Sequence, residues 1–383
     1  MNALNATVDG VCPISCFDLL FDRELALYFP EDDVEGNVKI TLNKPLRLAN
    51  LRLIFKGRAN YENVPARTGS STKSSTSELT YFDKEVVLVD RLPGKEDTGE
   101  FVLPSGEHLI PYTFPLPKRL LSSYEGKYGS IRYYCQAVIS RTGHENYVTE
   151  RPFTVLSRDC SSSLNGSTSL DLLKPAIHSD SEKVTSCCSS GLISCEVTLP
   201  KLIYYPGEAV VASLVVVNDS RSALSKITAK LMQNETCISK LEPNVKVATS
   251  SRGVIETELD KRLGGRSKKS WPNEFLFTVP SLPASSESCP ILHIAYELQL
   301  ELVFASRSSQ LLIVQVPLQI GSPLDTSTDG DTTDQGAPSR PLLAAKSFKY
   351  VQCVFGPNVF EMDSNPSSLN RIEFTPVYPV LNS

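Results

Sequence analysis

The chain has no excess of positive charge and no long hydrophobic run. Its 383 residues carry 38 lysines and arginines against 43 aspartates and glutamates, which gives a net charge of −5. Nucleic-acid-binding domains present a basic face, so this charge balance gives no reason to expect nucleic acid as a partner. No apolar stretch approaches the roughly 20 residues that cross a bilayer as a helix, so we expect no transmembrane segment.

The chain is also poor in the groups that carry catalysis and bind metals. No histidine lies at zinc-ligand spacing from a cysteine or from another histidine. The four histidines are His108, His144, His178 and His293. No glycine-rich phosphate loop opens a helix, and no Gly-x-Ser-x-Gly nucleophile elbow occurs. We therefore expect no enzymatic activity, no cofactor and no metal.

The N-terminus lacks the basic and apolar regions of a secretory signal, which predicts a cytoplasmic protein. In that compartment the 10 cysteines are expected to be free thiols. Cys135 lies inside an apolar strand and is expected to pack as a small hydrophobic residue. Cys187 and Cys188 are adjacent in sequence. Three roles stay open for this pair: two plain thiols, a lipid-modified pair, or a pair active in thiol exchange.

Two separated stretches of sequence look like two copies of one domain. YFPEDDVEGNVKITL from Tyr28 is similar to YYPGEAVVASLVVVN from Tyr204. Further along, IRYYCQAVI from Ile131 is similar to IAYELQLEL from Ile294. The same series of strand-like segments recurs in the same order, which indicates two tandem domains rather than one large domain.

Apolar and polar residues alternate along most of the chain. In VKITL, for example, Val38, Ile40 and Leu42 alternate with Lys39 and Thr41. Such alternation marks a β-strand with one buried face. Many short strands of this kind, separated by Gly, Pro and Ser clusters, predict an all-β fold of two immunoglobulin-like β-sandwiches with almost no helix.

Composition divides the chain into four parts. The first sandwich is placed at residues 14–157 and the second at residues 188–321. Residues 158–187 are rich in serine and are predicted to form the linker between them. Residues 322–383 begin as a polar, acidic stretch, which predicts a flexible, disordered C-terminal tail that carries docking motifs.

Several segments resemble the arrestin-domain-containing proteins, or α-arrestins. HLIPYTFPLP from His108 and SSYEGKYGSIRYYCQAVI from Ser122 are similar to the N-domain signature of that family. SEKVTSCCSSGLISCEVTLPKLIYYPGEAVV from Ser181 is similar to the junction that leads into its second domain. The resemblance covers roughly residues 14–320 and implies two tandem sandwiches of the arrestin type.

The resemblance implies a cytosolic adaptor or scaffold. Its sandwiches would bind the cytoplasmic segments of membrane receptors or transporters, and its tail would link this cargo to endocytic trafficking, sorting or ubiquitination. The protein would then be recruited from the cytoplasm to the plasma membrane and endosomes. The alternative is a thiol-dependent redox or metabolic regulator, similar to the thioredoxin-binding branch of the family. That role needs an accessible cysteine of low pKa.

A degenerate docking motif, TPVYP, lies near the C-terminus. α-Arrestin tails typically carry Pro-Pro-x-Tyr motifs, which bind WW domains of HECT-type ubiquitin ligases as polyproline II segments. In this chain Thr375 replaces the first proline, while Pro376 and Tyr378 are retained. We expect Pro376 and Tyr378 to contact a WW domain; the alternative is that the segment packs within the molecule.

One loop gathers positive charge, in the sequence KRLGGRSKK. Clustered cations close to a membrane attract anionic lipid head groups by about 1 kcal/mol per basic residue. Peripheral membrane contact is therefore predicted for five side chains, and the alternative is a solvated hairpin tip. The five are Lys261, Arg262, Arg266, Lys268 and Lys269.

Overall fold

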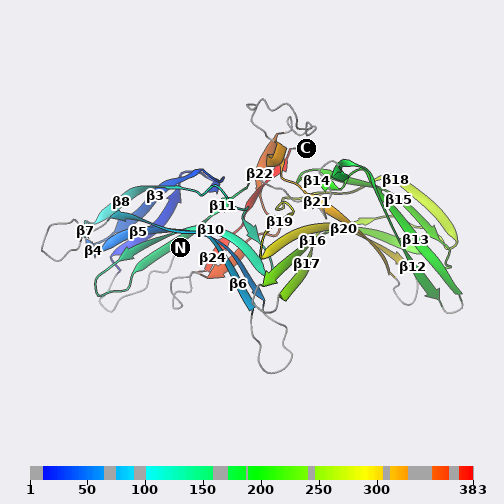
Figure 1. Cartoon of the computed structure of the whole chain (residues 1–383), viewed down its shortest axis with the longest axis horizontal. Coiled ribbons are helices and arrows are strands. Elements are labelled where there is room, and N and C mark those ends of the chain that lie inside the picture. Colours follow the sequence, from blue (N-terminus) through cyan, green and yellow to red (C-terminus); the bar gives the residue numbers. More distant parts are fainter. Residues whose placement is uncertain are drawn as a thin grey trace, which may run out of the picture. The chain divides into compact units, whose positions relative to one another are not determined.

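The chain folds almost entirely into β-strands (Figure 1). A computed structural model describes residues 12–63, 75–89, 101–157, 171–186, 189–239, 246–304, 311–326, 347–361 and 371–382. Within these ranges the only helical elements are two short 3-10 turns, η1 (Asp171–Leu173) and η2 (Pro323–Thr326). The prediction of an all-β protein is confirmed.

The first compact unit contains residues up to Ser157 together with Gly356–Val377. It has a three-stranded sheet in the order β1-β3-β8 and a larger sheet in the order β2-β11-β10-β5-β6, with β9 paired to β10. Two strand pairs, β4-β7 and β23-β24, complete it. The bounds are β1 (Ile14–Phe21), β2 (Leu27–Tyr28), β3 (Asp33–Leu42), β4 (Leu46–Leu48), β5 (Asn50–Asn63), β6 (Ser75–Val89), β7 (Phe101–Leu103), β8 (Gly106–Pro115), β9 (Tyr124–Glu125), β10 (Gly129–Ser140), β11 (Tyr147–Val155), β23 (Asn358–Glu361) and β24 (Arg371–Phe374).

The second unit contains residues Arg158–Phe355 and Tyr378–Ser383. Its sheets repeat the plan of the first unit, in the orders β12-β13-β15-β18 and β14-β21-β20-β16-β17, with β19 paired to β20. The bounds are β12 (Ala176–Ser186), β13 (Ser189–Leu199), β14 (Ile203–Tyr204), β15 (Ala209–Asn218), β16 (Leu224–Ser239), β17 (Lys246–Leu259), β18 (Ser267–Thr278), β19 (Ser286–Cys289), β20 (Leu292–Phe304), β21 (Leu311–Ile320), β22 (Phe348–Gln352) and β25 (Val377–Leu381).

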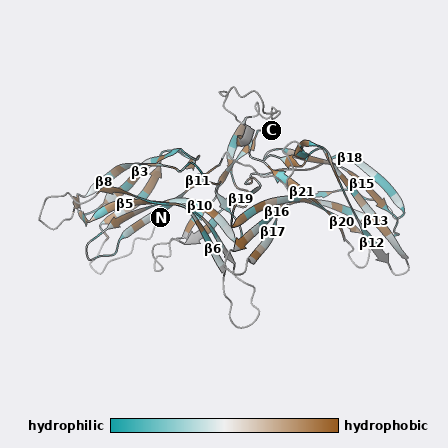
Figure 2. Cartoon of the chain, in the orientation of Figure 1, coloured by the Kyte–Doolittle hydropathy of each residue, from teal (hydrophilic) through white to brown (hydrophobic). Residues whose placement is uncertain are grey.

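Alternating burial along the strands builds a separate core in each unit. In β15 every second residue from Val210 to Asn218 is buried, and β20 shows the same alternation. Figure 2 shows hydrophobic and hydrophilic residues interspersed along the strands. Ile131 on β10 and Leu298 on β20 are 4% and 0% exposed. Strands with this alternation contribute one apolar row to the interior of their sandwich.

The two units share a turn as well as a strand order. In the first unit, the carboxylate of Asp32 accepts the Phe29 N–H at 3.0 Å and pairs with Arg23. The corresponding turn of the second unit is built in the same way. There, the carboxylate of Glu208 accepts the Tyr205 N–H at 3.2 Å and forms an ion pair with Lys201. The two turns are thus similar in sequence and also share the same pattern of hydrogen bonds.

Part of the predicted linker is a strand. Ala176–Ser186 forms β12, which pairs along its length with β13. It was missed because β12 is an edge strand with little apolar surface to bury, so its sequence lacks the usual alternation. His178 and Asp180, for example, oppose Val197 and Cys195 and carry no apolar signal of their own.

The prediction of a disordered tail is wrong for residues 347–361 and 371–382. These residues form β22, β23, β24 and β25. The polar, acidic stretch before them carries the signal for disorder, whereas VYPVL is apolar and four of its five residues are buried. A segment that buries this much apolar surface is part of the fold.

Candidate functional site

The basic loop is held in place by a buried asparagine. Asn218, which is fully buried, donates through Nδ2 to the carbonyl oxygens of Ser222 at 2.7 Å and Gly264 at 3.1 Å. The Arg266 N–H donates to the Ser220 carbonyl at 2.8 Å. Because these bonds join the loop to the turn after β15, the loop has a defined shape.

The five cations predicted for lipid contact do not act alike. Lys261 forms an ion pair with Glu274 at 2.8 Å, and only about a fifth of its side chain is exposed. Arg262 lies 3.4 Å from the Asp260 carboxylate, with both side chains exposed. The neighbouring acids therefore offset the charge of these two cations. Both acids lie outside KRLGGRSKK, so the charge of that motif alone does not reveal these pairings.

Three cations remain available to an external anion. Arg266, Lys268 and Lys269 are all exposed, and within the described ranges no ion pair involves any of them. Arg266 has a backbone φ of 53°. Lys269 lies 5.3 Å from the ring centre of Trp271, an arrangement that leaves its ammonium group at the surface. The structure thus reduces the predicted set of five to a group of three on the loop and the start of β18.

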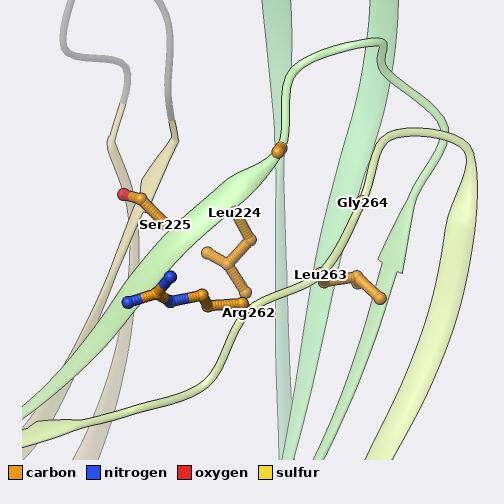
Figure 3. A pocket seen from close by; sticks show the side chains of 6 residues that line it. Leu224, Ser225, Arg262, Leu263 and Gly264 are labelled. Carbon is orange, nitrogen blue, oxygen red and sulfur yellow. The ribbon is translucent and has the colours of Figure 1, made fainter.

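A shallow hollow of about 430 Å³ lies beside this loop. It is lined by Ala223, Leu224, Ser225, Arg262, Leu263 and Gly264. In Figure 3 the Arg262 side chain and the Leu263 side chain point in opposite directions. Apart from Ser225 and Arg262, the residues that line the hollow are apolar or glycine.

The second predicted site, TPVYP, is packed into the protein. Pro376 is buried, and Tyr378 is 2% exposed. Both belong to the segment that leads into and forms β25, which pairs with β22. The alternative stated for this motif, that it packs within the molecule, describes its arrangement in the structure. A WW domain reads these two side chains from an exposed peptide, so docking requires β25 to leave its place.

Comparison with known proteins gives the family. Residues 17–159 match the model of the arrestin (or S-antigen) N-terminal domain, and residues 189–324 match that of the C-terminal domain. The chain is 31% identical over 318 residues to arrestin domain-containing protein 17 of Caenorhabditis elegans, covering 80% of this chain and 70% of that protein. The chain belongs to the arrestin-domain-containing proteins.

Two mammalian members of the family are also similar. Arrestin domain-containing protein 4 of Homo sapiens is 27% identical over 324 residues, covering 83% of this chain and 73% of that protein. The Mus musculus protein of the same name is 26% identical over 309 residues, covering 79% and 70%. The family resemblance inferred from the sequence is confirmed. Family membership supports a role as an adaptor that binds partner proteins.

In the part of this arrestin-domain protein that the structure describes, the cysteines form no disulfide bond. Burial is the main cause that raises the pKa of Cys195 to about 12, and it holds the pKa of Cys135 and Cys237 well above the ordinary range. Buried thiols of high pKa are poor nucleophiles. Cys187 and Cys188, the pair considered for thiol exchange, lie outside the described residues.

Among the described residues, no group of three or more His, Cys, Asp or Glu side chains is placed to hold a metal ion. No helix in this part of the chain is long and apolar enough to span a membrane.

Proposed function

We propose that this arrestin-domain protein is a cytosolic adaptor for membrane cargo. Its two units bind cytoplasmic segments of receptors or transporters, and its C-terminal segment links the cargo to endocytic trafficking, sorting or ubiquitination. The observation that carries the proposal is the pair of long open edges on the six-stranded sheets. β6 and β17, of 15 and 14 residues, are the terminal strands in their sheet orders.

An open edge strand suits an extended peptide. Its unpaired N–H and C=O groups provide the affinity, while nearby side chains provide selectivity. Each edge also carries an exposed valine, Val87 on β6 at 49% and Val247 on β17 at 60%. These side chains offer apolar contact to an added strand.

Ion pairs between β5 and β6 limit the kind of peptide that can bind at the β6 edge. Arg58 is already paired with Glu78 at 3.4 Å and with Asp83 at 3.1 Å. A phosphorylated segment would have to displace both carboxylates to reach this guanidinium. The proposal therefore rests on strand addition and does not require a phosphorylated cargo at this edge.

Membrane contact through Arg266, Lys268 and Lys269 complements cargo binding. Each exposed cation near an anionic leaflet adds about 1 kcal/mol of attraction. Contact of this kind would bring the protein to the plasma membrane or endosomes, where its cargo lies.

The strand-addition proposal is tested with charged edge variants. Val87→Lys and Val247→Lys each place a charge on one open edge, which disfavours strand pairing. The probes are synthetic peptides that copy juxtamembrane cytoplasmic segments of transporters. We expect one of the two changes to weaken binding at least tenfold. The control is Val359→Lys, because Val359 is 51% exposed and lies on β23. Equal binding by all four proteins would contradict the proposal.

A further inference from the structure

The C-terminal strand β25 is docked on the second unit. The Leu381 N–H donates to the Pro206 carbonyl at 2.8 Å, and the Asn382 N–H donates to the Ser347 carbonyl at 2.9 Å. The Asn382 side chain adds a bond from Nδ2 to Ser347 Oγ at 2.8 Å. The strand is therefore attached by backbone bonds at its very end, just after the TPVYP motif.

The strand that pairs with β25 is itself fastened to the second unit. The Ser281 hydroxyl donates to the Val351 carbonyl at 2.8 Å, and the Val354 N–H donates back to the Ser281 carbonyl at 3.0 Å. The Arg252 guanidinium lies 3.2 Å from the ring centre of Phe355. β22, the strand that pairs with β25, is thus held on the second unit by these contacts.

The receiving turn differs from its counterpart in one informative position. Gly207 and Glu31 hold the same place in the two equivalent turns, and both have a left-handed backbone, with φ of 92° and 69°. Glu31 shows that this conformation does not by itself require glycine. A Cβ on Gly207, however, would lie 2.4 Å from the Leu381 carbonyl oxygen. Gly207 therefore makes room for the C-terminal strand, whereas the side chain of Glu31 is 63% exposed.

In the docked strand, the TPVYP motif that would recruit a WW domain is buried. Val377 and Leu381, at either end of β25, are 6% and 5% exposed, and Tyr378 between them is 2% exposed. Pro376 and Pro379 are also buried. A WW domain grips proline and tyrosine side chains from outside, so the docked strand offers it no surface.

We propose that β25 is a removable strand whose docking beside Gly207 masks TPVYP, and that a WW-domain partner binds only after the strand is released. This inference rests on the proposed recruiting role of the C-terminal segment and adds its regulation. The affinity of a motif that is exposed only part of the time falls by the fraction exposed. A docked population about 100 times the released one would weaken binding about 100-fold.

Two variants release the strand by different routes. Gly207→Asn keeps a residue that tolerates positive φ but adds the Cβ that meets Leu381. A chain that ends at Pro379 keeps Pro376 and Tyr378 and loses the bonds of Leu381 and Asn382. Glu31→Asn is the matched control, because it makes the same substitution in the equivalent turn of the first unit.

Hydrogen–deuterium exchange of the full chain tests the masking directly. We expect the amides of residues 377, 378 and 380–382 in the wild type to exchange at least tenfold more slowly than in the isolated peptide 371–383; residue 379 is proline and has no amide hydrogen. In Gly207→Asn the same amides should exchange at the peptide's rate, and for the shorter chain the comparison is the amides of residues 377 and 378. Glu31→Asn should match the wild type. Wild-type exchange as fast as that of the peptide, or unchanged protection in both release variants, would overturn the proposal.

Titration with an isolated WW domain of a HECT-type ligase separates this inference from the proposed function. We expect the peptide and both release variants to bind at least tenfold more tightly than the wild-type chain. Wild-type binding equal to that of the peptide would overturn the masking. If the peptide itself does not bind, the ligase-recruiting role fails, and the exchange measurement alone decides whether the strand is a removable cover.

Discussion

Tyr133 and Tyr296 occupy the same position in the two units and make the same bond. The Tyr133 hydroxyl donates to the Leu121 carbonyl at 2.8 Å, and the Tyr296 hydroxyl donates to the Pro283 carbonyl at 2.8 Å. Both tyrosines are almost fully buried, on β10 and β20. Each bond joins the central strand of a six-stranded sheet to the segment that precedes it, so the duplicated fold keeps a duplicated polar contact.

Replacing these tyrosines by phenylalanine should destabilise both units. Tyr133→Phe removes the hydrogen bond to the Leu121 carbonyl, at a cost of about 1 kcal/mol. Tyr296 also accepts from Gln233 Nε2 at 2.7 Å, so Tyr296→Phe affects the Pro283 carbonyl and the Gln233 amide and should cost about 2 kcal/mol. Urea unfolding of both variants measures the two losses. An unchanged free energy of unfolding in either variant would show that its hydroxyl contributes nothing to stability.

Leu298 tests the core of the second unit. It lies on β20 between Leu231 and Val316 and is fully buried. Leu298→Ala should lower the free energy of unfolding by about 2–5 kcal/mol, because it removes apolar contacts and leaves a cavity. Gln299→Ala, one residue further along the same strand, is the control and should change stability little. An unchanged melting temperature in Leu298→Ala would show that this side chain is outside the core.

The buried thiol of Cys195 should make stability fall in alkali. Its pKa is raised to about 12 in the folded protein, whereas an unfolded cysteine titrates near about 8.5. Between these values the unfolded chain loses a proton that the folded chain keeps. The free energy of unfolding then falls with rising pH, by about 1.4 kcal/mol per pH unit for this group. Cys195→Ala should reduce the slope of stability against pH above pH 9; an unchanged slope would contradict the burial of the thiol.

The exposed lysines at the start of β18, Lys268 and Lys269, should contribute to vesicle binding, and Lys261, which is paired with Glu274, should not. Reversing Lys268 and Lys269 to Glu should weaken sedimentation with phosphoinositide-containing vesicles at low salt, because it removes attraction to the head groups. Lys261→Glu is the comparison, since that lysine is already neutralised by Glu274. Equal effects of both changes, or no binding by the wild type, would leave the loop with a structural role alone.

TPVYP should be a weak WW ligand when it is free. The isolated peptide lacks the first proline of the full motif at Thr375, and with it one stacking contact and some preorganisation. Tyr378→Ala in the peptide should abolish binding to the WW domain, while Thr375→Pro should strengthen it. A wild-type peptide that does not bind even at high concentration would remove the recruiting role from this segment.

Sequence alone could predict the duplicated fold because the repeat lies in side-chain patterns. Tyr28 and Tyr204 end the short strands β2 and β14, which pair in parallel with β11 and β21. The docking of Leu381 beside Gly207 could not be predicted, because it joins residues far apart in the chain through backbone atoms. The sequence does show that Gly207 and Glu31 differ in otherwise matching turns. The position of Leu381 in the structure explains this difference.

Proximity labelling by the full chain in living cells tests the adaptor role most directly. The account predicts that membrane receptors or transporters are labelled together with trafficking proteins or ubiquitin ligases. Val87→Lys and Val247→Lys should reduce the labelling of membrane cargo in at least one case, and Val359→Lys should not. A set of partners dominated by thioredoxin-like proteins and lost under oxidation, with no membrane cargo, would contradict the account.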